Sequence, residues 1–364
     1  MDKKIKKIGI LTGGGDCPGL NAVIRAVTRT AILKYNLEVV GFKNGYRGLY
    51  LGQTVRLDLD AISGILPRGG TILHTSNKDN LFRYPFIEDG KIVYRDVSDV
   101  GIQNIRDAGI DAMIIIGGDG TLTSARDFAR KGVNVVGVPK TIDNDLALTD
   151  VTFGFDTAVA VATEALDRLH STAESHHRIM CLEVMGRYAG WIALEAGIAG
   201  GADAILIPEI PYDIQKVAEK IIKRRHDGKD FSVVVVAEGA RPISGELTIS
   251  QVVEDSPDPI RLGGIGIQVA KQLEELVGLE ARATILGHLQ RGGTPTAYDR
   301  ILSTRYGAAA VELVMEQKFG NMVTLKGNDM SYDSLENVIG KLKNVDPEGE
   351  LVKTAKGIGI CFGD

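Results

Sequence analysis

The chain has 364 residues, of which 44% are hydrophobic and 24% are charged, and its formal net charge is -5. This length predicts about two domains, each with its own core, and the acidic balance argues against a nucleic-acid-binding protein. Its three cysteines, Cys17, Cys181 and Cys361, lack paired or metal-ligand spacing, and no signal peptide or membrane-spanning run is expected, so we predict a cytoplasmic protein.

Apolar strand-like runs alternate with helical patterns along the chain. Strands are predicted at Lys7–Leu11, Glu38–Phe42, Ala112–Ile116, Val133–Val138, Ile179–Glu183, Ala204–Ile207, Ser232–Ala237 and Ala281–Leu286. Helices are predicted at Leu20–Lys34, Leu122–Lys131, Thr157–Ala173, Ile214–Arg225 and Ile265–Val277. Such apolar strands separated by helices predict an α/β fold with mainly parallel sheets covered on both faces. The polar segment Gly239–Pro259 is predicted to be a surface loop.

Three segments in the N-terminal part of the chain have the composition of a polyphosphate site. They are Gly13–Asn21, Gly117–Thr121 and Pro139–Asp145, and the first two lie between a predicted strand and a predicted helix, where open α/β sheets bind ligands. Glycine lets backbone groups approach phosphate oxygens closely. A carboxylate among glycines, Asp119, suits a phosphate that carries magnesium. Glycine and Asp/Asn turns also occur without any ligand, so the combination of the three segments carries the prediction.

These segments together resemble the phosphofructokinase family. Further family-like motifs follow in the expected order: Met185-Gly186-Arg187, Ala237-Glu238-Gly239 and Leu286 to Gly293. The resemblance covers roughly residues 5 to 310. It implies two doubly wound α/β domains that face each other across an active-site cleft. The nucleotide domain would comprise residues 1–154 plus about 290–325, and the sugar-phosphate domain residues 155–289, with a tail of about 326–364 packing on it.

The resemblance implies phosphoryl transfer from MgATP to the 1-hydroxyl of fructose 6-phosphate, a glycolytic reaction that requires a base, a held donor and positive charge. It implies Asp143 as the base, with Thr141 and Arg187 as further catalytic residues. Asp119 would position Mg²⁺. The donor would contact Gly14, Gly118, Asp119, Gly120, Thr121, Lys140 and Lys78.

The resemblance also assigns residues to the sugar phosphate, where planar guanidinium groups suit phosphate oxygens. These residues are Thr141, Asp143, Asp145, Arg178, Met185, Gly186, Arg187, Glu238, Arg282, His288 and Arg291. Arg178 is expected to reach across a subunit interface. The chain is therefore expected to form a homo-oligomer, a dimer or a homotetramer.

The phosphoryl donor is left open by two positions. Pyrophosphate-dependent members of the resembled family have an aspartate at the position of Gly120 and a lysine at that of Lys140, whereas the best-known bacterial ATP-dependent members have glycine at both. This chain combines Gly120 with Lys140. Because a small residue at 120 leaves room for a nucleotide, ATP is favoured, and pyrophosphate is the alternative donor.

A dinucleotide-binding oxidoreductase or a non-catalytic nucleotide sensor is the rival class. The segment Gly13–Gly19 lacks the Gly-x-Gly-x-x-Gly spacing of dinucleotide-binding folds, and Asp143 is present where a sensor would have lost its base. A lipid or NAD kinase would account for Gly117–Thr121 but not for the segment His288–Gly293.

Overall fold

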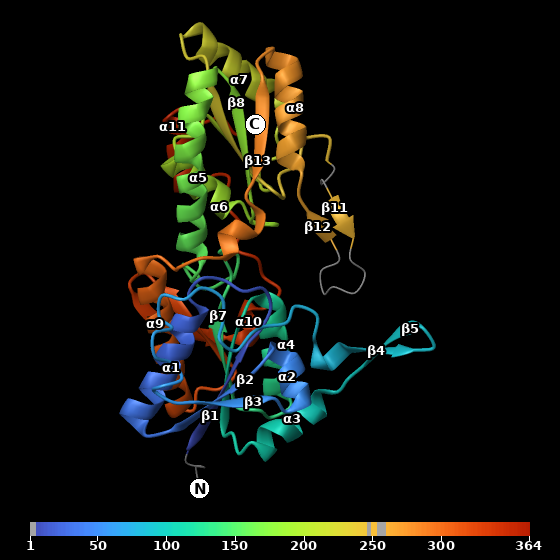
Figure 1. Cartoon of the computed structure of the whole chain (residues 1–364), viewed down its shortest axis with the longest axis vertical. Helices are drawn as coiled ribbons and strands as arrows, with labels where there is room; N and C mark the ends of the chain where they lie inside the picture. Colours follow the sequence, from blue (N-terminus) through green and yellow to red (C-terminus); the bar gives the residue numbers. More distant parts are fainter. Residues whose placement is uncertain (1–4, 246–248, 253–259) are drawn as a thin grey trace. The chain divides into compact units, whose positions relative to one another are not determined.

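The computed structural model describes residues 5–245, 249–252 and 260–364. The chain folds into two compact units (Figure 1). The first unit contains the residues up to Thr141, together with Leu146–Gly154 and Arg291–Lys341. The second contains Ile142–Asp145, Phe155–Gln290 and Leu342–Asp364. The chain therefore passes between the units several times, first between Thr141 and Ile142.

The first unit is built on a seven-stranded sheet with the order β15-β14-β7-β6-β1-β2-β3. The strands are β1 (Lys7–Thr12), β2 (Glu38–Phe42), β3 (Thr54–Leu57), β6 (Ala112–Gly117), β7 (Val135–Pro139), β14 (Asn321–Lys326) and β15 (Asp329–Ser334). The inner strands pair in parallel, and only β3 and β15 at the edges are antiparallel. Because β2 and β6 flank β1, the sheet order reverses there, and the loops after β1 and β6 meet at the switch point where such sheets bind ligands.

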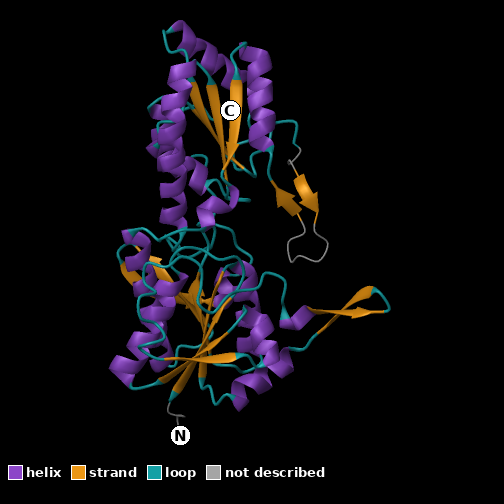
Figure 2. Ribbon diagram, in the orientation of Figure 1, coloured by secondary structure: helices purple, strands orange, loops and turns teal. Residues whose placement is uncertain are grey.

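Helices cover the sheet of this unit (Figure 2). Helices α1 (Leu20–Tyr35) and α9 (Ala297–Met315) pack together so closely that a Cβ on Gly307 would lie 2.7 Å from the Val23 carbonyl oxygen. Side chains of α2 (Gly45–Leu51), α3 (Ser98–Asp107), α4 (Asp119–Arg130) and α10 (Leu335–Val338) share a core with the strands. Burial of these apolar side chains holds the strand ends, and with them the ligand-binding loops, in fixed positions.

The second unit has a parallel sheet with the order β13-β8-β10-β9. Its strands are β8 (Ile179–Val184), β9 (Ala204–Leu206), β10 (Ser232–Ala237) and β13 (Ala281–Ile285). Its helices are α5 (Phe155–His176), α6 (Trp191–Ala199), α7 (Ile214–His226), α8 (Ile265–Val277) and α11 (Glu350–Gly357), with a 3-10 turn η2 (Gly287–Arg291) at its boundary with the first unit. Helices α7 and α8 share a buried core with β8 and β10. The carboxyl ends of β8, β10 and β13 consequently lie at one edge of this sheet.

The structure confirms the predicted α/β class and finds every predicted strand within two residues and every predicted helix within three residues of its predicted bounds. The prediction that Gly239–Pro259 is only a loop was wrong. It contains β11 (Ile249–Val252), which pairs antiparallel with β12 (Ile260–Leu262). The polar composition of the segment hid a short β-forming run. Residues 246–248 and 253–259 of that segment lie outside the described residues.

A further hairpin was not predicted. After the 3-10 turn η1 (Leu81–Arg83), strands β4 (Tyr84–Glu88) and β5 (Lys91–Arg95) form a ribbon that extends away from the body of the first unit (Figure 1). Its turn residues Asp89 and Gly90 have φ angles of 49° and 73°, a conformation that Asp-Gly pairs favour in tight hairpins. Among the described residues, no helix is both long and apolar enough to cross a membrane.

Candidate active site

The first glycine loop is closed by hydrogen bonds to two neighbouring segments. The Gly13 amide donates to the Ile116 carbonyl (2.9 Å), and the Gly14 amide donates to the Ser76 carbonyl (3.2 Å). The Thr75 hydroxyl donates to the Gly14 carbonyl (2.6 Å). Gly14 has φ 76°, which favours glycine. Because its amide is already bonded within the chain, Gly14 does not offer this group to a ligand. Its lack of a side chain instead lets a ligand approach the backbone closely.

Thr121 locks the loops after β1 and β6 together. A Cβ on Gly13 would lie 2.6 Å from Thr121 Cγ2, and a Cβ on Gly117 would lie 2.3 Å from it. Thr121 is buried, and its carbonyl accepts a hydrogen bond from the Tyr46 hydroxyl (2.8 Å). These two glycines are therefore required for close packing around one threonine side chain.

Gly13→Ala is expected to destabilise the fold by about 1–3 kcal/mol, because the added methyl group overlaps Thr121 in a packed environment. The melting temperature should fall by roughly 2–4 °C per kcal/mol, measured by calorimetry. Gly357→Ala in α11 is the matched control, since a Cβ there meets no atom within 4 Å. An unchanged melting temperature for Gly13→Ala would contradict the packing argument.

Lys140 brings a positive charge to the same place. Its side chain is buried with 4% exposure, and its Nζ lies 3.6 Å from the position of a Cβ on Gly14. Its amide donates to the Gly117 carbonyl (2.9 Å). The loops at residues 13–15, 117–121 and 140–141 thus converge at the carboxyl ends of β1, β6 and β7. That they bind a polyphosphate stays a prediction.

Arg291 adds a second cation to the glycine loop. Its guanidinium NH1 donates to the Asp16 carbonyl (3.3 Å) and lies 3.0 Å from the position of a Cβ on Gly15. The sequence assigned Arg291 to the sugar phosphate, and within the first unit it lies beside the loop assigned to the donor. Cys17, in the same loop, is no reactive nucleophile, because burial raises the pKa of its thiol to about 12 despite the opposing charges of Lys140 and Arg291.

Gly120 faces open space. It is exposed, and a Cβ at this position would meet no heavy atom within 4 Å. Asp119 precedes it at the start of α4, and its Oδ1 accepts a hydrogen bond from the Gly340 amide (3.0 Å). No cluster of three or more potential metal ligands exists among the described residues. A single carboxylate fits a magnesium ion that arrives on a polyphosphate and keeps its other oxygen ligands.

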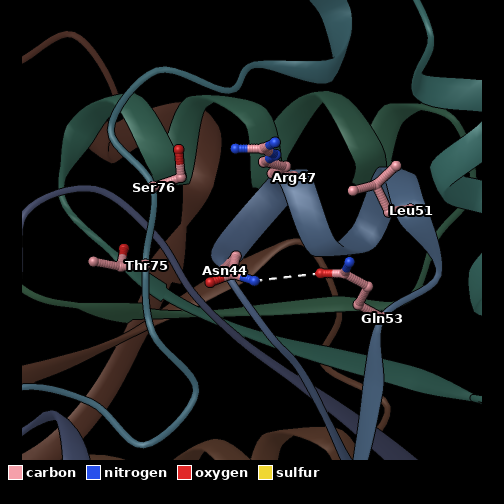
Figure 3. A pocket seen from close by; sticks show the side chains of 6 residues that line it. All are labelled: Asn44, Arg47, Leu51, Gln53, Thr75 and Ser76. Atoms are coloured by element: carbon pink, nitrogen blue, oxygen red, sulfur yellow. Dashed lines mark hydrogen bonds between the residues drawn. The ribbon is translucent and has the colours of Figure 1, made fainter.

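A polar pocket of about 390 Å³ adjoins the first glycine loop, Gly13–Gly15 (Figure 3). It is lined by Asn44, Arg47, Leu51, Gln53, Thr75 and Ser76, and Figure 3 shows the Arg47 side chain lying between those of Ser76 and Leu51. Thr75 and Ser76 are also the residues that bond to Gly14. Sequence reasoning missed Arg47, since only the fold brings α2 to this loop. The predicted donor contact Lys78 is exposed two residues after Ser76.

In the second unit, the Asp143–Asp145 segment is well packed. Asp143 is 9% exposed, and Asn144 is 4% exposed with φ 52°, a conformation that asparagine tolerates better than most residues. The side-chain oxygen of Asn144 accepts a hydrogen bond from Lys343 Nζ (2.8 Å). Thr141, at the end of the first unit, is buried, and its carbonyl accepts a hydrogen bond from the Thr152 hydroxyl (2.8 Å).

Predicted sugar-binding residues meet at the carboxyl ends of β8 and β10. The Arg187 amide donates to Glu238 Oε1 (3.2 Å), and a Cβ on Gly239 would overlap the Arg187 carbonyl oxygen. Gln290 of η2 is fully buried, and its Oε1 accepts a hydrogen bond from the Met185 amide (3.3 Å). The segment that carries His288 is therefore tied to Met185. Gly186, with φ 135°, makes the sharp turn between Met185 and Arg187 possible.

Arg178 and Arg282 lie elsewhere on this sheet. Arg178 directly precedes β8, and Arg282 is the second residue of β13, so both lie at the amino edge of the sheet. Both guanidinium groups bond to the Glu280 carboxylate. Strand β8 has six residues, so this edge lies about 17 Å along the strand from the Met185 edge. Within the unit, these arginines are therefore not brought together with Met185, Arg187 and Glu238.

A family model for phosphofructokinase matches residues 7–314, and the chain belongs to the phosphofructokinase family. It is 70% identical over 366 residues to ATP-dependent 6-phosphofructokinase 2 of Clostridium perfringens, covering 100% of both chains. It is 50% identical to the pyrophosphate–fructose 6-phosphate 1-phosphotransferase of Amycolatopsis methanolica, covering 94% of this chain and 97% of that one.

Among solved structures, the chain resembles Pichia pastoris phosphofructokinase in the T-state, with a TM-score of 0.78 and 34% identity. That match covers 93% of this chain but only 36% of the much longer yeast chain. The fold of this chain is therefore the fold of the phosphofructokinase family.

Proposed function

We propose that this chain is an ATP-dependent 6-phosphofructokinase, which transfers the γ-phosphoryl group of MgATP to the 1-hydroxyl of fructose 6-phosphate. The products are fructose 1,6-bisphosphate and ADP, so the enzyme acts in glycolysis. The full-length relative from Clostridium perfringens carries this activity in its name. The single structural observation that favours ATP is the open space at Gly120.

The proposed donor side belongs to the first unit, and most of the proposed sugar side to the second. The glycine loops approach the donor phosphates closely, and the Lys140 ammonium, which lies near Gly14, faces their negative charge. Gly118, Asp119 and Thr121 are the further donor contacts that we propose. Asp119 would hold the magnesium ion of the bound triphosphate, and that ion would supply positive charge to the donor phosphates. Lys140 gains electrostatic strength from its burial, because water does not screen it there.

The proposed base is Asp143. As the sugar O1 bonds to the γ-phosphorus and the bond to the ADP oxygen breaks, the carboxylate of Asp143 accepts the hydroxyl proton. Thr141 and Asp145 flank it, and Arg187 stabilises the negative charge of the transferring group. Met185, Gly186, Glu238 and His288 hold the sugar phosphate at the strand ends, where Glu238 is already oriented by the Arg187 amide.

We infer that Arg178 and Arg282 act together on a neighbouring subunit's sugar phosphate. Both guanidinium groups bond to Glu280 at the amino edge of the sheet. If Arg178 acts across a subunit interface, as the resemblance implies, Arg282 therefore acts there too. This requires a homo-oligomer, either a dimer or a homotetramer, and we propose that it is cytoplasmic. Sedimentation would test the assembly, and a fully active monomer would contradict it.

A pyrophosphate-dependent phosphotransferase is the second candidate, favoured by the buried Lys140 and by the Amycolatopsis methanolica relative. Initial rates of fructose 1,6-bisphosphate formation, with magnesium and either ATP or pyrophosphate as sole donor, separate the two. Activity with ATP alone is the expected result. Activity with pyrophosphate alone would show that the charge of Lys140 outweighs the open space at Gly120, and no activity with either donor would refute the proposed function.

A further inference from the structure

The C-terminal segment reaches the loop that carries the proposed base. Lys343 bonds to this loop twice: its Nζ donates to Asn144 Oδ1 (2.8 Å), and its amide donates to the Asp145 carbonyl (2.8 Å). These residues are about 200 positions apart in the chain and belong to the same unit. The two bonds hold the side chain of Asn144 and the backbone of Asp145, the two residues that follow Asp143.

Lys343 is itself held by the region that begins α6. Its carbonyl accepts a hydrogen bond from Trp191 Nε1 (2.7 Å), and its Nζ lies 5.6 Å from the centroid of the Trp191 ring. Two residues later, the amide of the buried Val345 donates to Glu209 Oε1 (2.9 Å). The same oxygen accepts a hydrogen bond from the Gly190 amide (3.0 Å). The tail is thus anchored at Lys343 and again two residues after it.

The surroundings of Lys343 are acidic. Asp143 and Asp145 lie on the loop it contacts, Asp156 and Glu195 come from α5 and α6, and Glu209 anchors the tail. Burial raises the pKa of Glu195, and the charge of Lys343 opposes this rise. The ammonium of Lys343 therefore places positive charge where several carboxylates gather, which favours their ionised forms.

We propose that Lys343 is a positioning residue for the phosphoryl-transfer reaction: it clamps the Asp143–Asp145 loop and places a positive charge beside it. The inference rests on the proposed function. It assigns a role to the C-terminal segment, which lies beyond the part of the chain that the family model matches.

Three variants test the clamp. Lys343→Met keeps the length of the side chain and removes its charge and hydrogen bonds, Lys343→Arg keeps the charge, and Lys341→Met removes an exposed lysine two residues earlier. Lys343→Met is expected to lower kcat with the preferred donor by about 10- to 100-fold, because small displacements of a reacting group cost this much. The KM for that donor should change by less than about twofold.

The pH profile of kcat gives a second readout. Loss of a neighbouring cation disfavours the carboxylate of Asp143, so the acid limb of Lys343→Met should move to higher pH. Lys343→Arg should restore the wild-type limb and much of kcat, and Lys341→Met should match the wild type throughout. Unchanged kcat and pH profile in Lys343→Met, with an active wild type, would overturn the inference.

Hydrogen exchange separates this inference from the proposed function. In Lys343→Met, peptides that cover residues 142–146 should exchange faster than in the wild type, while peptides from β8 should not change. Inactivity of the wild-type enzyme with both donors would refute the proposed function and the catalytic part of the inference. Unchanged exchange at 142–146 would overturn the clamp whatever the activity.

Discussion

Replacement of Asp143 by asparagine is expected to lower kcat by about 10²- to 10⁴-fold, which is the usual contribution of a positioned general base. Asparagine has nearly the same shape, so it keeps the packing of a residue with 9% exposure, but it cannot accept the proton of the sugar hydroxyl. The KM for either substrate should change little, because the interaction lost belongs to the transition state. Steady-state kinetics with saturating donor measures both quantities.

Asp167→Asn is the control for this experiment, because Asp167 is an exposed aspartate on α5. It should have wild-type kinetics and stability. A loss of activity in Asp143→Asn of less than about tenfold, with wild-type stability, would mean that another group or water takes the proton. The assignment of the base to Asp143 would then be wrong.

Replacement of Gly120 by aspartate is expected to reduce kcat/KM for ATP by about 10²- to 10³-fold, since a like charge set against a bound anion costs several kcal/mol. The new side chain would project into open space, because a Cβ at this position has no heavy atom within 4 Å. We propose that the nucleotide occupies this space. Activity with pyrophosphate, which carries no nucleotide, should be lost far less or should appear.

Gly120→Ala distinguishes a general effect of substitution from the effect of the carboxylate. An alanine Cβ meets no atom within 4 Å, so this variant should keep its melting temperature and most of its activity with ATP. Equal use of ATP by wild type and Gly120→Asp would refute the proposal that the nucleotide occupies the space at Gly120. Donor choice would then have to come from Lys140 or from the pocket that contains Arg47.

Local patterns in the chain predicted the elements and the glycine loops because these depend on neighbouring residues. The apolar run Ile8–Leu11 followed by Gly13–Gly15 is a strand and a close-packed loop in any parallel sheet of this kind. The β4–β5 hairpin carries an equally local signal in Asp89-Gly90, which the prediction overlooked. In contrast, β11 lies in a polar segment where composition gave no warning.

Residue roles were harder to predict because they depend on which edge of a sheet a side chain reaches. Arg282 stands only a few residues before His288 in sequence, yet the length of β13 separates them, and Arg282 shares Glu280 with Arg178. Arg291 likewise bonds to the Asp16 carbonyl beside the glycine loop. Sequence motifs selected these arginines as candidates but did not predict where each one lies.

The sequence alone determined the family, the glycine loops, the presence of Asp143 and the absence of a side chain at Gly120, since these are properties of residue identity and short-range order. Tertiary structure decided that the Gly14 amide is bonded to Ser76, that Arg47 lines one pocket with Thr75 and Ser76, and that Lys343 holds Asn144. These contacts join residues far apart in the chain. They form only when burial of the two cores brings distant segments together, and no local pattern encodes that approach.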